Sequence, residues 1–355
     1  MIYLDYNATT PIDKDVSDAM LPYLYGNFGN PSSSHELGVI AKNAVENARR
    51  QVGSESNNMV IKGVAHTYKN KGNHIITSKI EHPAIINPFK YLEKLGYEIS
   101  YLSVDKYGIV NPSHVEKLIT DKTILITVMH SNNETGTLQP IEEITEISRG
   151  HSIFFHTDAS QSIGKVPVDV KKLGVDFLTV AGHKLYAPKG IGALYIKNGI
   201  DIEPLIHGAG HEGGKRAGTE NIILDVALGK ACEISTESLK GSEIKRLTEY
   251  FYNSLKEKFG DAIHLNGHPD NRLPNTLNIS FLGYNGHEVL NGLNEIAAST
   301  GSACHSGLTT ISPVLKAMGV SDEVGRGAVR FSLGRYTTKE EIDTVIENLN
   351  KIIVI

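Results

Sequence analysis

Short apolar runs alternate with amphipathic segments along the first two thirds of the chain. The runs are rich in Ile, Val, Phe and Thr, as buried strands are, and they cover residues 74–78, 98–104, 123–129, 152–157 and 176–180. Within residues 35–52 the apolar positions share one helical face, formed by Leu37, Ile40, Ala41, Ala44, Val45 and Ala48. Strands that alternate with helices predict an α/β fold, with a mostly parallel sheet and helices on its faces.

The pattern changes near residue 243. One helical stripe is predicted there, formed by Ile244, Leu247, Phe251, Leu255 and Phe259. Strand-like runs follow at residues 276–281 and 328–333, and Thr338 with Glu341 has the spacing of a capping box that opens the last helix. This part of the sequence predicts a second, smaller α+β domain.

Composition and charge narrow the class of protein. The chain has 355 residues, enough for two domains. A net charge of -5 gives no basic field for nucleic acid or an anionic membrane, and no apolar stretch is long enough to span a bilayer. The start of the chain has no secretory signal pattern, and its two cysteines fit neither a disulfide framework nor a metal motif. We therefore expect a cytoplasmic protein without a resident metal.

The strongest chemical signal is Lys184, in the segment AGHKLYAPKGIG that starts at Ala181. The lysine lies just beyond a predicted buried strand and ahead of a Gly-rich turn. A lysine in this position can lose part of its hydration and be neutral part of the time, as a Schiff base requires. An isolated lysine is ordinarily a solvated loop residue, but the neighbouring residues favour the chemical role.

A second signal is the segment HTDASQ, at the end of another predicted strand. Asp158 in this segment can face the pyridine nitrogen of pyridoxal phosphate and hold the ring as an electron sink. Gln161 can donate to the ring oxygen. The alternative is that Asp158 caps the following helix, which is the stronger interpretation when this segment is taken alone.

The two cysteines have different surroundings. Gly and Ser flank Cys304 in STGSACHSG, which predicts a mobile loop. A free thiol has a pKa of about 8.5, and His305 is a candidate to lower it. Cys232, in LGKACEI, is predicted to be a core residue of a helix.

Nine segments occur in one order along nearly the whole chain: YLDYNATTP, NFGNPSSSH, KIEHPAI, MHSNNETG, DASQSIGK, GHKLYAPKGIG, GHEGGKRAGTEN, STGSACHSG and RFSLGRYTTKEEID. They resemble the class V aminotransferase family and, more narrowly, its cysteine desulfurases of the NifS/IscS group. The resemblance implies a homodimer of the pyridoxal-phosphate-dependent transferase type (fold type I). It implies a large cofactor domain at residues 13–242. A small domain would be formed by residues 1–12 with 243–355 and would carry the Cys304 loop.

The resemblance also implies roles for residues around the cofactor ring. Lys184 would bind the cofactor covalently and carry a proton, Asp158 would pair with the ring nitrogen, and Gln161 would contact the ring oxygen. His82 would stack on the ring and assist acid–base steps, and Asn133 would touch the ring oxygen or the substrate. The alternatives are a half-buried structural histidine at position 82 and a turn asparagine at position 133.

Further roles concern the phosphate and the substrate. Arg330 would bind the substrate carboxylate with its planar, always-charged fork; the alternative is a surface ion pair on an edge strand. Nearby, Arg335 is predicted to be structural. Thr219 would reach the phosphate in the neighbouring subunit, or else cap the next helix. The other expected contacts are His183, Ser54 and Glu55 for the cofactor and Ala8 and Thr9 for the substrate.

The activity that the resemblance implies is removal of sulfur from L-cysteine. Alanine would leave and a persulfide would form on Cys304, to be passed to a scaffold or carrier protein for iron–sulfur cluster assembly or tRNA thiolation. Cys304 would also be a candidate transient iron–sulfur ligand. Three alternatives remain open: a selenocysteine lyase, an aminotransferase of the same fold, and a cofactor-deficient assembly or binding subunit that is not an enzyme.

Two departures from the family pattern concern the phosphate. The family has a serine where this chain has Ala181, which removes one hydroxyl ligand at a cost of about 1 kcal/mol. After Val52, about 15 residues are absent, the length of a strand with its turns. We therefore expect the central sheet to lack one strand, and Ser54 and Glu55 to open a helix whose N-terminus favours an anion.

Overall fold

The protein is described here from a computed structural model, which describes residues 1–48, 54–239, 243–300 and 311–354. Its largest sheet has the strand order β3-β2-β4-β5-β6-β7. Five strands are parallel: β2 (His74–Ser78), β3 (Glu98–Leu102), β4 (Thr123–Thr127), β5 (Phe154–Asp158) and β6 (Phe177–Ala181). All five were predicted, with ends that differ by up to two residues. The antiparallel edge strand β7 (Gly192–Ile196) was not.

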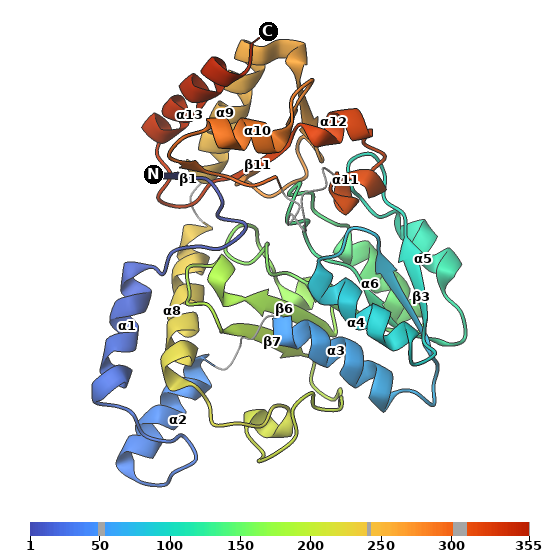
Figure 1. The fold of residues 1–355 in the computed structure, drawn as a ribbon. Helices are drawn as coiled ribbons and strands as arrows, with labels where there is room; N and C mark the ends of the chain where they lie inside the picture. The colour runs from blue at the N-terminus through green and yellow to red at the C-terminus, as the bar shows by residue number, and fades with distance from the viewer. Residues whose placement is uncertain (49–53, 240–242, 301–310, 355) are drawn as a thin grey trace.

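Helices cover both faces of this sheet (Figure 1). On one face, α3 (Ser54–Thr67) and α4 (Pro83–Glu93) enclose a core with Ile61, Ile75 and Phe89. The core of the other face contains Phe155. Helices on that side are α1 (Lys14–Tyr25), α5 (Pro112–Leu118), α6 (Ile141–Gly150), α7 (Val170–Leu173) and α8 (Ile222–Ser238). Helix α2 (Glu36–Ala48) packs against α8. This is the α/β architecture that the alternating pattern predicts.

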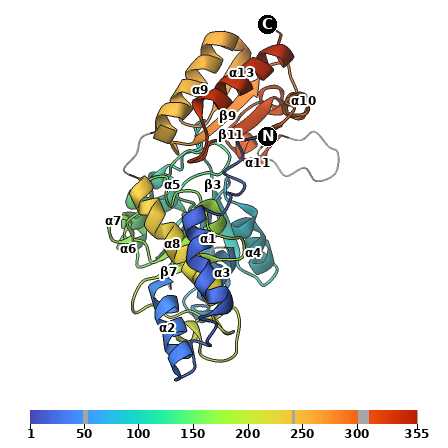
Figure 2. The same ribbon diagram turned by 90° about the vertical axis from the view of Figure 1, so that its left-hand side faces the viewer.

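A second core lies around an antiparallel sheet with the order β11-β9-β8. Its strands are β8 (Ile263–Asn266), β9 (Thr276–Phe281) and β11 (Ala328–Ser332). Helices α9 (Glu243–Phe259) and α13 (Lys339–Ile352) cover it, and α10 (Gly286–Gly292), α11 (Pro313–Ala317) and α12 (Asp322–Arg326) lie nearby (Figure 2). The apolar stripe of α9 is buried or partly buried as predicted, and the capping box between Thr338 and Glu341 is present.

The N-terminal segment connects the two cores. Strand β1 (Ile2–Tyr3) pairs with β10 (Ile296–Ala297), and Leu4 belongs to the second core. Asp5 forms a bridge with Ser332, and the chain then turns toward the large sheet, where Thr10 bonds to the main chain of His183. Residues 5–10 therefore lie between the two sheets, beside the ends of β5 and β6.

The connection from α2 to α3 is short. Helix α2 ends at Ala48 and α3 begins at Ser54, and the structure describes no strand between them. β7 is therefore the last described strand at its edge of the large sheet. The expected loss of one strand stays a prediction, because residues 49–53 lie outside the described residues. None of the described helices is both long and apolar enough to cross a membrane.

Candidate functional site

Lys184 lies directly after the buried strand β6. The strand ends at Ala181 and a single 3-10 turn, η1 (Gly182–Lys184), follows. A Cβ at Gly182 would stand 2.8 Å from the carbonyl oxygen of Ile191, so the turn requires glycine there. The Nζ of Lys184 donates to the carbonyl oxygens of Asn7 at 2.5 Å and Ala8 at 2.7 Å.

Electrostatics favour a reactive amine at this position. Burial lowers the pKa of Lys184 to about 8, with a further lowering by the charge of Arg330. The carboxylates of Asp5 and Asp158 oppose this shift but do not cancel it. About a tenth of the amine is therefore neutral at pH 7, as predicted for a lysine that attacks a carbonyl carbon.

Asp158 lies at the end of β5, the strand next to β6, and is 8% exposed. Its Oδ2 accepts from Nδ2 of Asn57 at 2.7 Å, and its Oδ1 accepts from the main-chain nitrogen of Ser160 at 2.9 Å. The local bond to Ser160 is turn-like, but turns rather than a helix follow, so the capping alternative is wrong. The other carboxylate oxygen of Asp158 is held by Asn57, which comes from α3.

Gln161 and Asn7 form the centre of a polar network. The Nε2 of Gln161 donates to the carbonyl oxygen of Asn7 at 2.9 Å, and its Oε1 accepts from Lys165 at 2.9 Å. The carbonyl oxygen of Asn7 also accepts from Lys184. Gln161 and Lys184, predicted separately from two motifs, thus meet at one oxygen of the N-terminal segment.

Arg330 enters from β11 of the small sheet and is 5% exposed. Its guanidinium donates to Oδ1 of Asp5 at 2.6 Å and to the carbonyl oxygen of Asn133 at 3.0 Å. Its Nε is buried and has no partner among the described residues. The alternative of a surface ion pair is wrong, because the pair with Asp5 is buried. Asn133 takes part through its main chain.

His82 is the N-cap of α4, where its Nδ1 accepts from the main-chain nitrogen of Ala84 at 3.1 Å. The residue is exposed, so the alternative of a half-buried histidine is wrong. Surrounding protein lowers its pKa, while the charges of Asp158 and Lys184 act on it in opposite directions. The ring therefore lies near both groups.

The remaining residues of the N-terminal segment contact the lysine turn. The Nδ1 of His183 lies 3.3 Å from Oγ1 of Thr9, and burial together with Lys184 lowers the pKa of His183 to about 4. Ala8 contributes the carbonyl oxygen that binds Lys184. Arg335 pairs with Asp13 at 2.6 Å, which agrees with its predicted structural role.

The residues expected near the phosphate are less well connected. Ser54 opens α3, but its side chain lies outside the described residues. Glu55 accepts from Nε of Arg216 at 2.9 Å. Thr219 is exposed and does not cap α8, because Asn221 is the N-cap of that helix. Cys304, the expected sulfur acceptor, also lies outside the described residues, whereas Cys232 is in α8 and partly buried.

The donor set fits pyridoxal phosphate at its ring. Asp158 offers a fixed carboxylate, Lys184 an amine and Gln161 an amide. In the first turn of α3, Ser56 Oγ and Asn57 Oδ1 are buried without partners among the described residues. Buried polar atoms ordinarily have partners, so these two atoms can bind a polar ligand beside Asp158.

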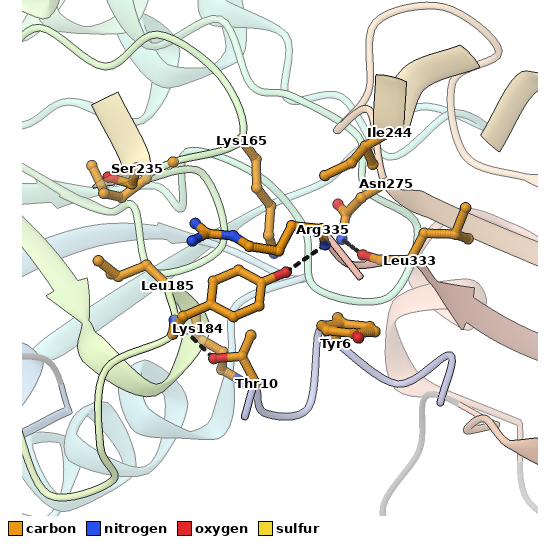
Figure 3. A pocket seen from close by; sticks show the side chains of 13 residues that line it. Tyr6, Thr10, Lys165, Lys184, Leu185, Ser235, Ile244, Asn275, Leu333 and Arg335 are labelled. Carbon is orange, nitrogen blue, oxygen red and sulfur yellow. Dashed lines mark hydrogen bonds between the residues drawn. The ribbon is translucent and has the colours of Figure 1, made fainter. Parts of the chain in front are cut away.

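Behind Lys184 lies a cavity of about 40 Å³. Figure 3 shows Lys165, Lys184 and Arg335 in its wall together with Tyr6 and Asn275. A cavity of this size has room for water but not for a cofactor. The cofactor would therefore lie outside this cavity.

The fold and the site together define a class of protein. A parallel sheet with a lysine and an aspartate at the ends of neighbouring strands is an arrangement that can hold pyridoxal phosphate. The family model described as "Aminotransferase class-V" matches residues 2–345. The chain belongs to this family.

Individual relatives and solved structures are similar to the chain over nearly its whole length. "Cysteine desulfurase IscS" of Dictyoglomus turgidum is 47% identical, covering 99% of this chain and 94% of the relative. A protein of that name from Methanosarcina thermophila is 46% identical, with 99% and 92% covered. Among solved structures, "NIFS-LIKE PROTEIN" is 35% identical with a TM-score of 0.92, covering 99% and 98%. "SspA in complex with cysteine" is 37% identical with a TM-score of 0.85, covering 95% and 100%.

The alignment with the Dictyoglomus relative also bears on the short α2–α3 connection. It spans 373 residues, more than the 355 of this chain, so the relative has residues without a counterpart here. A segment missing after Val52, as predicted, would account for part of this difference.

Three polar residues of the site were not predicted: Asn7, Asn57 and Lys165. Asn7 and Lys165 lie inside two of the nine segments, whereas Asn57 lies outside them. Each bonds to a predicted residue: Asn7 and Lys165 to Gln161, and Asn57 to Asp158. For Asn57 a signal existed, because a buried asparagine in the first turn of a helix needs a partner.

Proposed function

We infer that this chain is a pyridoxal-phosphate-dependent cysteine desulfurase, which converts L-cysteine to L-alanine and transfers the sulfur atom. One observation carries the inference: Lys184 and Asp158, from neighbouring strands, join one buried polar site in a chain whose relatives are named cysteine desulfurases. The "SspA" neighbour, titled as a complex with cysteine, supports the substrate.

The cofactor supplies an electron sink for the substrate Cα, which the protein alone does not have. Asp158 would hold a proton on the ring nitrogen, and Asn57 and Ser160 would keep its carboxylate in place. Gln161 would contact the ring oxygen and His82 would stack on the ring. Lys184 would bind the cofactor and, once released, move a proton at the substrate Cα, a task suited to its lowered pKa.

Arg330 would bind the substrate carboxylate. Its guanidinium is buried and already oriented by Asp5 and Asn133, so little side-chain entropy is lost when substrate binds. The unpartnered Nε is a further donor. Ala8, Thr9 and Asn133 would line the same place. The N-terminal segment bonds to both Arg330 and Lys184, and the carbonyl oxygen of Asn133 accepts from Arg330 and Asn7.

Cys304 would accept the sulfur. A bond forms between its sulfur and the substrate sulfur, the substrate Cβ–S bond breaks, and a proton goes to the carbon that becomes the alanine methyl group. One thiol and one cysteine thus give one persulfide and one alanine, with no external oxidant or reductant. Cys304 lies in a Gly/Ser-rich stretch of sequence that suits transfer to a protein acceptor.

The test is the Cys304→Ala variant, with Cys232→Ala as the matched control. We expect Cys304→Ala to bind the cofactor normally but to form no enzyme persulfide, while Cys232→Ala in α8 forms persulfide as the wild type does. Full persulfide and sulfide output from Cys304→Ala would exclude this role and favour selenocysteine lyase. Consumption of an oxo acid would favour an aminotransferase instead. A wild-type chain without visible cofactor absorbance would favour a binding subunit.

Three further features belong to the same proposal. We propose domains at residues 13–242 and at 1–12 with 243–355, supported by the separate cores around the two sheets. We propose a homodimer in which Thr219, exposed in this chain, reaches the partner's phosphate, with Ser54, Glu55 and His183 on the phosphate of their own subunit. The sulfur acceptor would be a scaffold or carrier protein in a reducing compartment.

A further inference from the structure

A second lysine, Lys165, reaches the site from the turns that follow β5. Its Nζ donates to Oε1 of Gln161 at 2.9 Å and to Oδ1 of Asn7 at 3.0 Å. No carboxylate of the described residues lies within ion-pair distance of it. Part of the residue is exposed, but its amine is surrounded by protein, and burial lowers its pKa well below the usual value. A neutral amine still has two hydrogens, so both bonds persist in either protonation state.

These two bonds decide how two amides are oriented. A side-chain amide has an oxygen that accepts and a nitrogen that donates, on ends of nearly equal shape. The Lys165 amine donates to both amide oxygens, and the carbonyl oxygen of Asn7 can only accept. Together they turn the oxygen of Gln161 toward Lys165 and its nitrogen away from Lys165. That nitrogen donates one hydrogen to the carbonyl oxygen of Asn7 and keeps a second hydrogen for a ligand.

The same argument holds for Asn7. Its Oδ1 accepts from Lys165 and from Nδ2 of Asn275 at 3.2 Å, which leaves Nδ2 to donate to Oγ1 of Thr276 at 2.8 Å. A fixed side chain also fixes the main-chain carbonyl of Asn7, and this carbonyl accepts from both Gln161 and Lys184. Lys165 therefore acts on two groups of the site without touching the ligand position itself.

We propose that Lys165 is a positioning residue, which makes Gln161 present an N–H rather than a carbonyl oxygen to the cofactor and holds the Asn7 carbonyl that binds Lys184. The proposal rests on the proposed function, since it assigns a role toward the same cofactor. Without Lys165 the Gln161 amide keeps only its bond to the Asn7 carbonyl. A turned amide would place its oxygen against an electron-rich ring oxygen, which is repulsive.

The test measures the cofactor's visible absorbance as a function of pH in Lys165→Met, Gln161→Leu and the double variant. Methionine keeps the length of the side chain beside the cavity and removes both donors. We expect Lys165→Met to raise the midpoint of this titration by about 1 pH unit, because the ring oxygen loses a donor and the proton on the Lys184 nitrogen is held more tightly. Gln161→Leu should give a similar shift, and the double variant no further one.

Control variants separate positioning from a merely structural role. Lys165→Arg keeps the donors and should have a midpoint near that of the wild type. Lys197→Met removes an exposed lysine that pairs with Asp176 at 3.1 Å, away from the site, and should not change it. An unchanged midpoint in Lys165→Met with only lower thermal stability, or fully additive shifts in the double variant, would overturn the proposal.

A further variant keeps the proposal testable if Lys165→Met does not fold. Gln161→Glu has the same length and can accept from Lys165, but it has no N–H to offer, so it must give the raised midpoint with Lys165 in place. A wild-type midpoint in Gln161→Glu would contradict the proposal. Failure of the proposed function looks different, because the wild-type chain would then show no cofactor absorbance at any pH.

Discussion

Two sides of the site differ in how completely their polar groups are bonded. On the ring side, defined by Asp158, Gln161 and Lys184, each side chain has at least two hydrogen bonds to described residues. On the phosphate side, defined by the start of α3 and Ala181, two buried polar atoms have no described partner, and the structure describes no strand between α2 and α3. In the proposed function the reaction takes place on the ring side, while the phosphate would contribute mainly affinity.

This difference suggests that the chain keeps its chemistry and gives up part of its hold on the phosphate. A parallel sheet tolerates the loss of an edge strand, because β6 and β7 still pair along their whole length. Loss of a ring-side residue is less well tolerated, since each of these side chains is hydrogen-bonded to other residues of the site. Substitutions on the ring side should therefore have larger effects than those on the phosphate side.

The largest effect is expected for Lys184→Ala on the ring side. The variant loses the amine that binds the cofactor and moves the proton, so alanine formation from L-cysteine should fall by at least about a thousandfold. The matched control is Lys189→Ala, an exposed lysine in the same segment, which should retain the wild-type rate. Comparable losses in both variants would mean that the segment, rather than the Lys184 amine, is what matters.

The next effect concerns Asn57, which lies on the phosphate side but bonds to the ring side. Asn57→Ala removes the 2.7 Å bond to the Asp158 carboxylate. A hydrogen bond to a charged group is worth about 1.5–3 kcal/mol, so the cofactor should bind roughly ten- to a hundredfold more weakly. The measurement is a cofactor titration, with Asn58→Ala as the control. Equal weakening by both variants would show that α3 as a whole, and not this bond, supports Asp158.

The sequence predicted the buried strands and the residues at their ends better than the hydrogen bonds between distant segments. Buried strands such as β2 and β4 were visible because runs of Ile, Leu and Thr are typical of them. β7 was not, because Gly192 and Ala193 begin it. Lys184 and Asp158 follow buried strands, which places them at one edge of the sheet. The bonds from Asn57 to Asp158 and from Lys165 to Asn7 join residues 101 and 158 positions apart, a separation that no local pattern reports.

The smallest effect should come from restoring a phosphate ligand with Ala181→Ser. Ala181 ends β6, three residues before Lys184, at the position where the resemblance to the family implies a serine. One added hydroxyl ligand is worth about 1 kcal/mol, so pyridoxal phosphate should bind roughly fivefold more tightly. Pyridoxal, which lacks the phosphate, serves as the matched ligand, and its affinity should not change. An equal increase in affinity for both ligands would mean that the hydroxyl stabilises the turn that carries Lys184. The added serine would then not act as a phosphate ligand.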